Sequence, residues 1–220
     1  MILADVDARL KSAGADDVPS VRRVRRGVSL DLKTASPDLV RAVAFALSAR
    51  DGPFDRFIGA ELLAAHPTAM RTLDASDLRQ LGEGMDSWDD VDVFACFLSG
   101  PVWRVGQLTD AEIRRWARSP DRWWRRAAVV STVPLNNRAR GGSGDPKRTL
   151  AICQLLLADR DPMVVKALSW ALRELAKRDP TAVRQFITTH GTKVPALVRR
   201  EVRSKLETGL KSITRAGASS

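Results

Sequence analysis

The stretch DPMVVKALSWALRELAK, residues 161–177, predicts a helix with one apolar side. Asp161 can cap the helix, and Pro162 suits its first position, where the missing N–H costs nothing. At about 100° per residue, the apolar side chains fall on one arc that must face a core. These side chains are Val164, Val165, Leu168, Ala171, Leu172 and Leu175.

Trp170 lies opposite that arc, where a large aromatic side chain is not needed for packing. It shares this side with Lys166 and Arg173 and with Met163, Glu174 and Lys177. One interpretation is that a neighbouring helix covers Trp170. The other is an aromatic surface framed by cations, which suits nucleic acid.

The rest of the chain also has helical periodicity, and no segment is a convincing strand. Boundaries such as Ser36-Pro37, Asp145-Pro146 and Asp179-Pro180 separate the predicted helices. Short, sequential helix pairs indicate an all-α fold, an α-solenoid of HEAT-like repeats, with one domain over 1–212 and a flexible tail at 213–220. We predict helices over 3–13, 18–34, 37–50, 54–65, 76–84, 87–99, 109–118, 121–133, 147–158, 162–178, 180–189 and 194–210.

Charge is distributed unevenly along the chain. The 220 residues carry a formal charge of +10. Residues 1–100 hold 12 basic and 16 acidic side chains, net −4, and residues 101–220 hold 24 and 10, net +14. Solubility does not require this segregation, whereas a polyanionic partner explains it. An arginine-rich composition inherited from a GC-rich genome is the alternative, but it does not explain why the excess lies in one half.

Cysteine and histidine usage excludes several classes of site. Cys96 and Cys153 sit singly in apolar runs, and the spacing of the two histidines matches no zinc motif. We therefore expect core thiols, no bound metal and a reducing compartment. The polar N-terminus is not a signal peptide, and no apolar run of about 18 residues exists, so we expect a cytoplasmic protein that does not enter a membrane.

An aspartate in the segment SWDDVD, residues 87–92, has an unusual position. Ser87 can cap a helix there, and the positive end of that helix explains Asp89 and Asp90. It explains Asp92 less well, because Asp92 lies in the second turn, one turn after Trp88. With Ala95, Cys96 and Ser99 nearby, these two side chains would border a shallow recess. A carboxylate on a protein that holds a polyanion repels its ligand, and stabilising a developing cation would justify it.

Two further segments concentrate arginine. In DRWWRRAAVV, residues 121–130, Arg126 shares a face with Trp123 and is a candidate phosphate contact, with Arg125 beside it. In LNNRARGGSG, residues 135–144, two arginines precede a glycine run. This connection is either a disordered surface loop or one whose Arg138 and Arg140 reach a phosphate backbone.

Three segments together resemble the AlkD-like DNA alkylation repair family, HEAT-repeat DNA glycosylases that excise alkylated purines. The segments are WDDVD (88–92), WWRRAA (123–128) and KALSWALRE (166–174), and the resemblance covers roughly 75–210. It implies that Asp92 is the catalytic carboxylate, that Trp88 and Trp170 flank the lesion within the duplex, and that Arg126 contacts the DNA backbone. We expect Arg125, Lys166, Arg173, Arg138 and Arg140 to assist in binding DNA.

The chemistry of alkylated purines agrees with this resemblance. Alkylation at N3 or N7 makes the purine cationic, so it leaves as a neutral base without a general acid. One carboxylate can stabilise the oxocarbenium-like sugar, and no metal or other cofactor is needed. We therefore expect a monomeric, monofunctional glycosylase acting on duplex DNA that contains alkylated bases. The alternatives are a non-catalytic HEAT-repeat DNA-binding protein and a protein-interaction scaffold.

Overall fold

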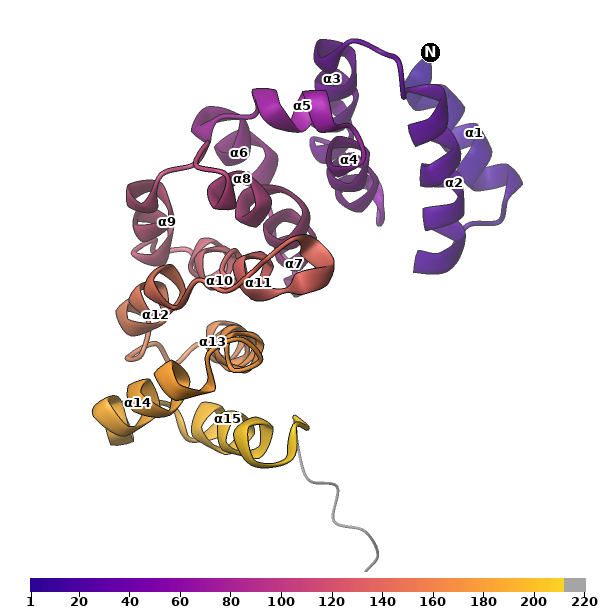
Figure 1. Cartoon of the computed structure of the whole chain (residues 1–220). Coiled ribbons are helices and arrows are strands. Elements are labelled where there is room, and N and C mark those ends of the chain that lie inside the picture. Colours follow the sequence, from indigo (N-terminus) through magenta and orange to yellow (C-terminus); the bar gives the residue numbers. More distant parts are fainter. Residues whose placement is uncertain (212–220) are drawn as a thin grey trace, which may run out of the picture. The chain divides into compact units, whose positions relative to one another are not determined.

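The computed structural model describes residues 1–211, and every regular element within them is helical (Figure 1). The predicted fold class, an all-α solenoid of HEAT-like repeats, is confirmed. The chain divides into two compact units, Met1–Thr109 and Asp110–Ser220, here called the N-terminal and C-terminal units. The tail predicted at 213–220 lies outside the described residues.

The N-terminal unit is built around α4, against which α2, α3, α5 and α7 pack. The side chains of Ile58, Leu62 and Leu63 on α4 are almost fully buried. Two features of this unit were not predicted from the sequence: the short helix α5, and the continuation of the helix predicted over 87–99 beyond residue 99. The helices are α1 (Ile2–Ser12), α2 (Val18–Asp31), α3 (Pro37–Ser48), α4 (Asp55–Ala64), α5 (Pro67–Thr72), α6 (Ala75–Gly82), α7 (Trp88–Phe94), the π-helical turn η1 (Ala95–Ser99) and α8 (Gly100–Arg104).

A buried carboxylate fastens α2 to α4. Glu61 is almost fully buried, and its two carboxylate oxygens each lie 2.9 Å from an arginine Nε, one from Arg22 and one from Arg25. Arg22 also lies over the ring of Phe57, 5.1 Å from its centre. Two of the four arginines in residues 22–26 therefore compensate a buried negative charge, which would be costly to leave unpaired.

The C-terminal unit has two layers of helices (Figure 1). One layer contains α10, α13 and α15, which pack side by side, and the other contains α9, α12 and α14. The elements are α9 (Asp110–Ala117), α10 (Arg122–Val130), α11 (Val133–Asn136), the 3₁₀ turn η2 (Arg138–Arg140), α12 (Pro146–Leu155), α13 (Pro162–Leu175), α14 (Pro180–His190), the 3₁₀ turn η3 (Gly191–Lys193) and α15 (Ala196–Thr208).

The helix predicted over 162–178 is α13, and it is the centre of this unit. The side chain of Asp161 accepts hydrogen bonds from the backbone N–H groups of Met163 and Val164, at 2.8 and 3.4 Å, so the predicted cap is confirmed. Most of the predicted apolar arc has no exposed surface, and only Val165 is partly exposed. The fully buried members are Val164, Leu168, Ala171, Leu172 and Leu175.

The connection at 135–144 is an ordered loop, not the disordered one that its glycine run suggested. Asn136 is fully buried, and its Nδ2 donates to Thr132 O and to Thr149 Oγ1, both at 2.9 Å. Its Oδ1 accepts from the backbone N–H of Asp145 at 2.9 Å, and its carbonyl accepts from Arg178 Nε at 2.8 Å. Asn136 thus ties both ends of the loop to α12 and to the residues that follow α13.

Gly142 lies against the backbone of α11. Its N–H donates to Asn137 O at 2.8 Å, and an added Cβ would lie 2.2 Å from Pro134 O and 2.6 Å from Leu135 O. These distances are too short for a side chain, so glycine is required here for space.

We expect Gly142→Ala to lower the free energy of unfolding by about 1–3 kcal/mol, because the extra methyl group must displace backbone atoms. Ser143→Ala is the matched control, since Ser143 is exposed in the same loop. Urea denaturation of both variants measures the difference. Equal stability of Gly142→Ala and the wild-type protein would contradict this packing.

Candidate active site and nucleic-acid interface

Trp88 and Asp92 lie one turn apart on α7 of the N-terminal unit. Ser87 caps this helix, with its Oγ accepting from the backbone N–H of Asp90 at 3.3 Å. Trp88 is 56% exposed, and Asp92 is partly exposed. Burial raises the pKa of Asp90, against the effect of its hydrogen bond to Ser87. The local structure therefore presents an indole and a carboxylate on the same side of one short helix.

A π-helical turn follows directly after this pair. The N–H of Gly100 donates to Ala95 O, five residues earlier, and Pro101 comes next within the same run of helix. Proline has no N–H, and its ring clashes with the carbonyl four residues before it in a regular α-helix. The wider turn accommodates Pro101, so the chain continues as helix to Arg104. Such turns often occur near functional sites.

This turn changes the surroundings expected for Asp92. The sequence predicted that Ala95, Cys96 and Ser99 would line a shallow recess beside Trp88 and Asp92. All three are buried, so they belong to the core of the N-terminal unit. The extra residue in the π-helical turn shifts the helical register, which a uniform period of 3.6 residues does not anticipate.

Trp170 lies on α13 of the C-terminal unit and is partly exposed. It is therefore neither sealed in the core nor fully open. Lys166, one turn before it, is exposed. Arg173 is partly buried, and its Nε donates to Ser169 Oγ at 3.2 Å and lies 3.6 Å from Glu201 Oε2. Burial lowers the pKa of Arg173, with Glu201 opposing this effect.

The side chains of Arg125 and Arg126 do not project freely into solvent, as phosphate contacts would be expected to do. Arg125 Nε donates to Asp159 Oδ2 at 2.7 Å, and its Nη1 donates to two backbone carbonyls near the start of α10. Arg126 is only 5% exposed, and its Nη1 donates to Met163 O at 2.6 Å. Both guanidinium groups thus join α10 to the segment around α13. The sequence placed them on the correct helix but could not reveal these long-range partners.

The remaining predicted cations lie nearer to solvent. Arg138 in η2 is exposed, and Arg140 is partly exposed. Trp103 and Trp116 are buried. The ring of Trp124 lies 4.9 Å from that of Trp116, and Arg122 stacks 4.6 Å above the ring of Trp123.

Sequence reasoning did not single out three arginines on α15. Arg199 is partly exposed, and Arg200 and Arg203 are exposed. The segment LVRREVR, residues 197–203, reads as an ordinary amphipathic helix, so its only distinguishing signal is the density of arginine.

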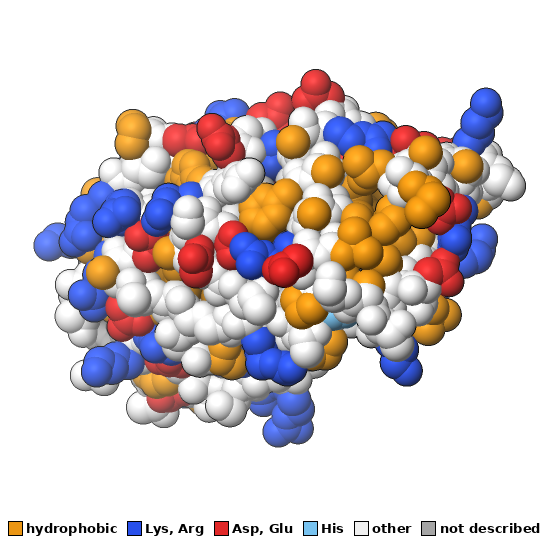
Figure 2. Space-filling view, turned by 90° about the horizontal axis from the view of Figure 1, so that it is seen from above, with side chains coloured by type: hydrophobic (Ala, Val, Ile, Leu, Met, Phe, Trp, Pro, Cys, Tyr) orange, Lys and Arg blue, Asp and Glu red, His pale blue; other side chains and the backbone are white. Residues whose placement is uncertain are grey.

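The two units differ strongly in charge. Residues 1–109 carry 13 basic and 16 acidic side chains, net −3, and residues 110–220 carry 23 and 10, net +13. Figure 2 shows a face on which Asp and Glu side chains lie among Lys and Arg side chains, so positive charge does not cover the whole surface. A polyanion would bind where the cations of the C-terminal unit are exposed.

We expect Arg126→Gln to lower the free energy of unfolding by about 1–3 kcal/mol, because Met163 O loses its buried donor. Lys166→Gln should change it by less than about 0.5 kcal/mol, because Lys166 is exposed. Urea denaturation and DNA titration of both variants separate the two roles. Unchanged stability together with reduced DNA affinity in Arg126→Gln would instead support a direct phosphate contact.

No group of three or more His, Cys, Asp or Glu side chains in residues 1–211 could hold a metal ion. In the same residues, none of the helices has the length and apolar character required to cross a membrane. Burial raises the pKa of the Cys153 thiol to about 12, which makes it a poor nucleophile.

Comparison with known proteins identifies the family. No curated protein sequence matches the chain significantly. A family model described as DNA alkylation repair enzyme matches residues 16–206. This match includes α7, α10 and α13, the helices that carry Trp88, Asp92, Arg126 and Trp170. The match extends over most of both units, and the chain therefore belongs to the DNA alkylation repair enzyme family.

Proposed function

We propose that this protein is a monofunctional DNA glycosylase that hydrolyses the N-glycosidic bond of cationic N3- or N7-alkylated purines in duplex DNA. The proposal rests mainly on Asp92, a partly exposed carboxylate one turn after the exposed Trp88. The family of this chain repairs alkylated DNA, and a carboxylate one turn from an indole suits one particular repair reaction.

The substrate itself supplies the leaving group. Alkylation at N3 or N7 places a positive charge on the purine ring. When the bond between C1′ and the purine nitrogen breaks, its electron pair moves to the base, which departs neutral. The positive charge then lies on the deoxyribose as an oxocarbenium-like ion, as in other glycoside hydrolyses. Catalysis therefore requires stabilisation of the sugar and a water molecule, but no general acid for the base.

We assign both of these tasks to Asp92. An ionised carboxylate near C1′ stabilises the cation that develops in the transition state. It can also orient a water molecule whose oxygen forms the new bond to C1′ and whose proton passes to the carboxylate or to solvent. The products are the free alkylpurine and an abasic site in an otherwise intact strand.

Aromatic and basic side chains would hold the DNA. We propose that Trp88 and Trp170 contact the lesion nucleotide, where an indole attracts a cationic base and packs against deoxyribose. Among the cations, Lys166, Arg138 and Arg140 would contact phosphates directly. Arg125, Arg126 and Arg173 would act by fixing the positions of α10 and α13. We further propose that the protein acts as a monomer in the cytoplasm.

Asp92→Asn should reduce the rate of base release from N7-methylguanine duplex by about 10²–10³-fold, because a neutral amide no longer stabilises the sugar cation. Removing this negative charge should leave DNA affinity unchanged or increase it. Asp89→Asn is the matched control: it removes one negative charge from the same helix at an exposed position in the first turn. Single-turnover release of the base measures the effect.

Equal rates in Asp92→Asn and the wild-type protein would refute the catalytic assignment. Salt-dependent duplex binding by a wild-type protein that releases no alkylated base would instead support the non-catalytic alternative.

A further inference from the structure

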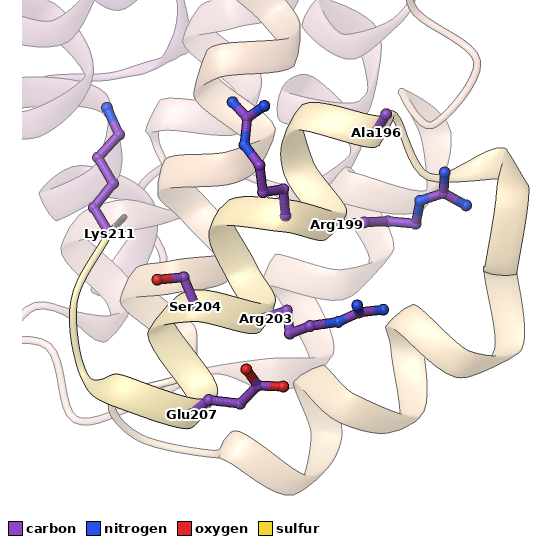
Figure 3. Close-up of a pocket in the computed structure, with 7 residues that line it drawn as sticks. Ala196, Arg199, Arg203, Ser204, Glu207 and Lys211 are labelled. Carbon is purple, nitrogen blue, oxygen red and sulfur yellow. The ribbon is translucent and has the colours of Figure 1, made fainter. Parts of the chain in front are cut away.

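The solvent side of α15 carries a group of cations that neither the family match nor the predicted site assigns. Figure 3 shows Arg199 and Arg203 extending on the same side of this helix. With neighbouring side chains they line a hollow of about 660 Å³. The polar residues that line it are Arg199, Arg200, Arg203, Ser204, Glu207 and Lys211.

Packing fixes which side of α15 faces solvent. Val198 and Val202 have no exposed surface, so the helix is docked by its apolar side. Glu201 fastens it to α13: its Oε2 accepts from Ser169 Oγ at 2.6 Å. Arg200 and Arg203, on either side of Glu201 in the sequence, are exposed as a consequence of this docking.

The cations around the hollow have little internal compensation. Within residues 1–211, neither Arg200 nor Arg203 forms an ion pair. Glu207 is the one acidic side chain among the residues that line the hollow. Glu201 is engaged with Ser169, and it lies 3.6 Å from Arg173 and 3.9 Å from Lys211. Most of the positive charge on α15 is therefore available to a ligand.

The arrangement of these cations suits a repeating anion. Helical residues three or four apart lie on neighbouring turns, roughly 5.4 Å apart along the axis, so Arg199 or Arg200 and Arg203 form a row. Phosphates repeat along a DNA strand in a comparable row. Guanidinium groups bind them with paired hydrogen bonds and without regard to sequence.

We propose that α15 is a second DNA contact. Through Arg200 and Arg203 it binds the sugar–phosphate backbone of the duplex at nucleotides other than the lesion. This inference rests on the proposed function only in taking duplex DNA as the ligand. The α15 contact contributes affinity for damaged and undamaged DNA alike, and it takes no part in breaking the glycosidic bond.

The test compares two double variants of the full-length protein. Arg200→Gln/Arg203→Gln removes the charges on α15. Arg184→Gln/Lys193→Gln removes two exposed charges from α14 and η3, and so leaves the same net charge. Fluorescence anisotropy with an undamaged duplex, repeated at several salt concentrations, gives the affinity and its salt dependence. Thermal denaturation confirms that both variants are folded.

We expect the α15 variant to lose about tenfold or more in affinity, and its salt slope to fall by about 1.8 for two lost phosphate contacts. The control should lose much less. Replacing both arginines by lysine should restore most of the slope, because the charges return. Equal losses in the two double variants, or no loss in the α15 variant, would overturn the proposal. Because the undamaged duplex needs no base release, this result is independent of the role of Asp92.

Discussion

The apolar side of α13 is the contact on which the C-terminal unit depends. Six of its apolar side chains are completely buried, and α10, α12 and α15 all pack against this helix. Burying each of its valine and leucine side chains stabilises the fold by about 1.5–3 kcal/mol, so the orientation of α13 is strongly determined. The same orientation places Lys166 in solvent and leaves Trp170 partly exposed. Hydrogen bonds and ion pairs from Arg126 and Glu201 further fix the neighbouring helices to α13.

Electrostatics makes two opposite demands on a protein with the proposed function. Its polyanionic substrate requires positive charge, whereas its reaction creates a cation that requires negative charge. The chain separates these demands: the C-terminal unit carries a net charge of +13, and Asp92 belongs to the N-terminal unit, with a net charge of −3. Many arginines nevertheless serve the fold, as Arg22 and Arg25 do at Glu61. Net charge alone therefore overstates the surface available to DNA.

Local features of the sequence were sufficient to predict most helices. The Asp161-Pro162 boundary and the apolar arc predicted the first residue of α13 and its end to within three residues, because caps and periodicity are local. Three features were not predictable in this way. The π-helical turn depends on how Pro101 is accommodated, the order of the loop at 135–144 depends on distant partners of Asn136, and the inward direction of Arg126 depends on Met163. The periodicity of α15 gave no reason to distinguish its arginines from an ordinary solvated surface.

Identification of the products formed from N7-methylguanine duplex tests the central claim most directly. The account predicts free 7-methylguanine that retains its methyl group, together with an abasic, alkali-labile site in the DNA, at a rate well above spontaneous depurination. Mass spectrometry of the released base and alkaline cleavage of the strand measure both products. Restoration of guanine within an intact strand, with the methyl group removed, would show that the protein repairs alkylation by a different reaction and would contradict the account.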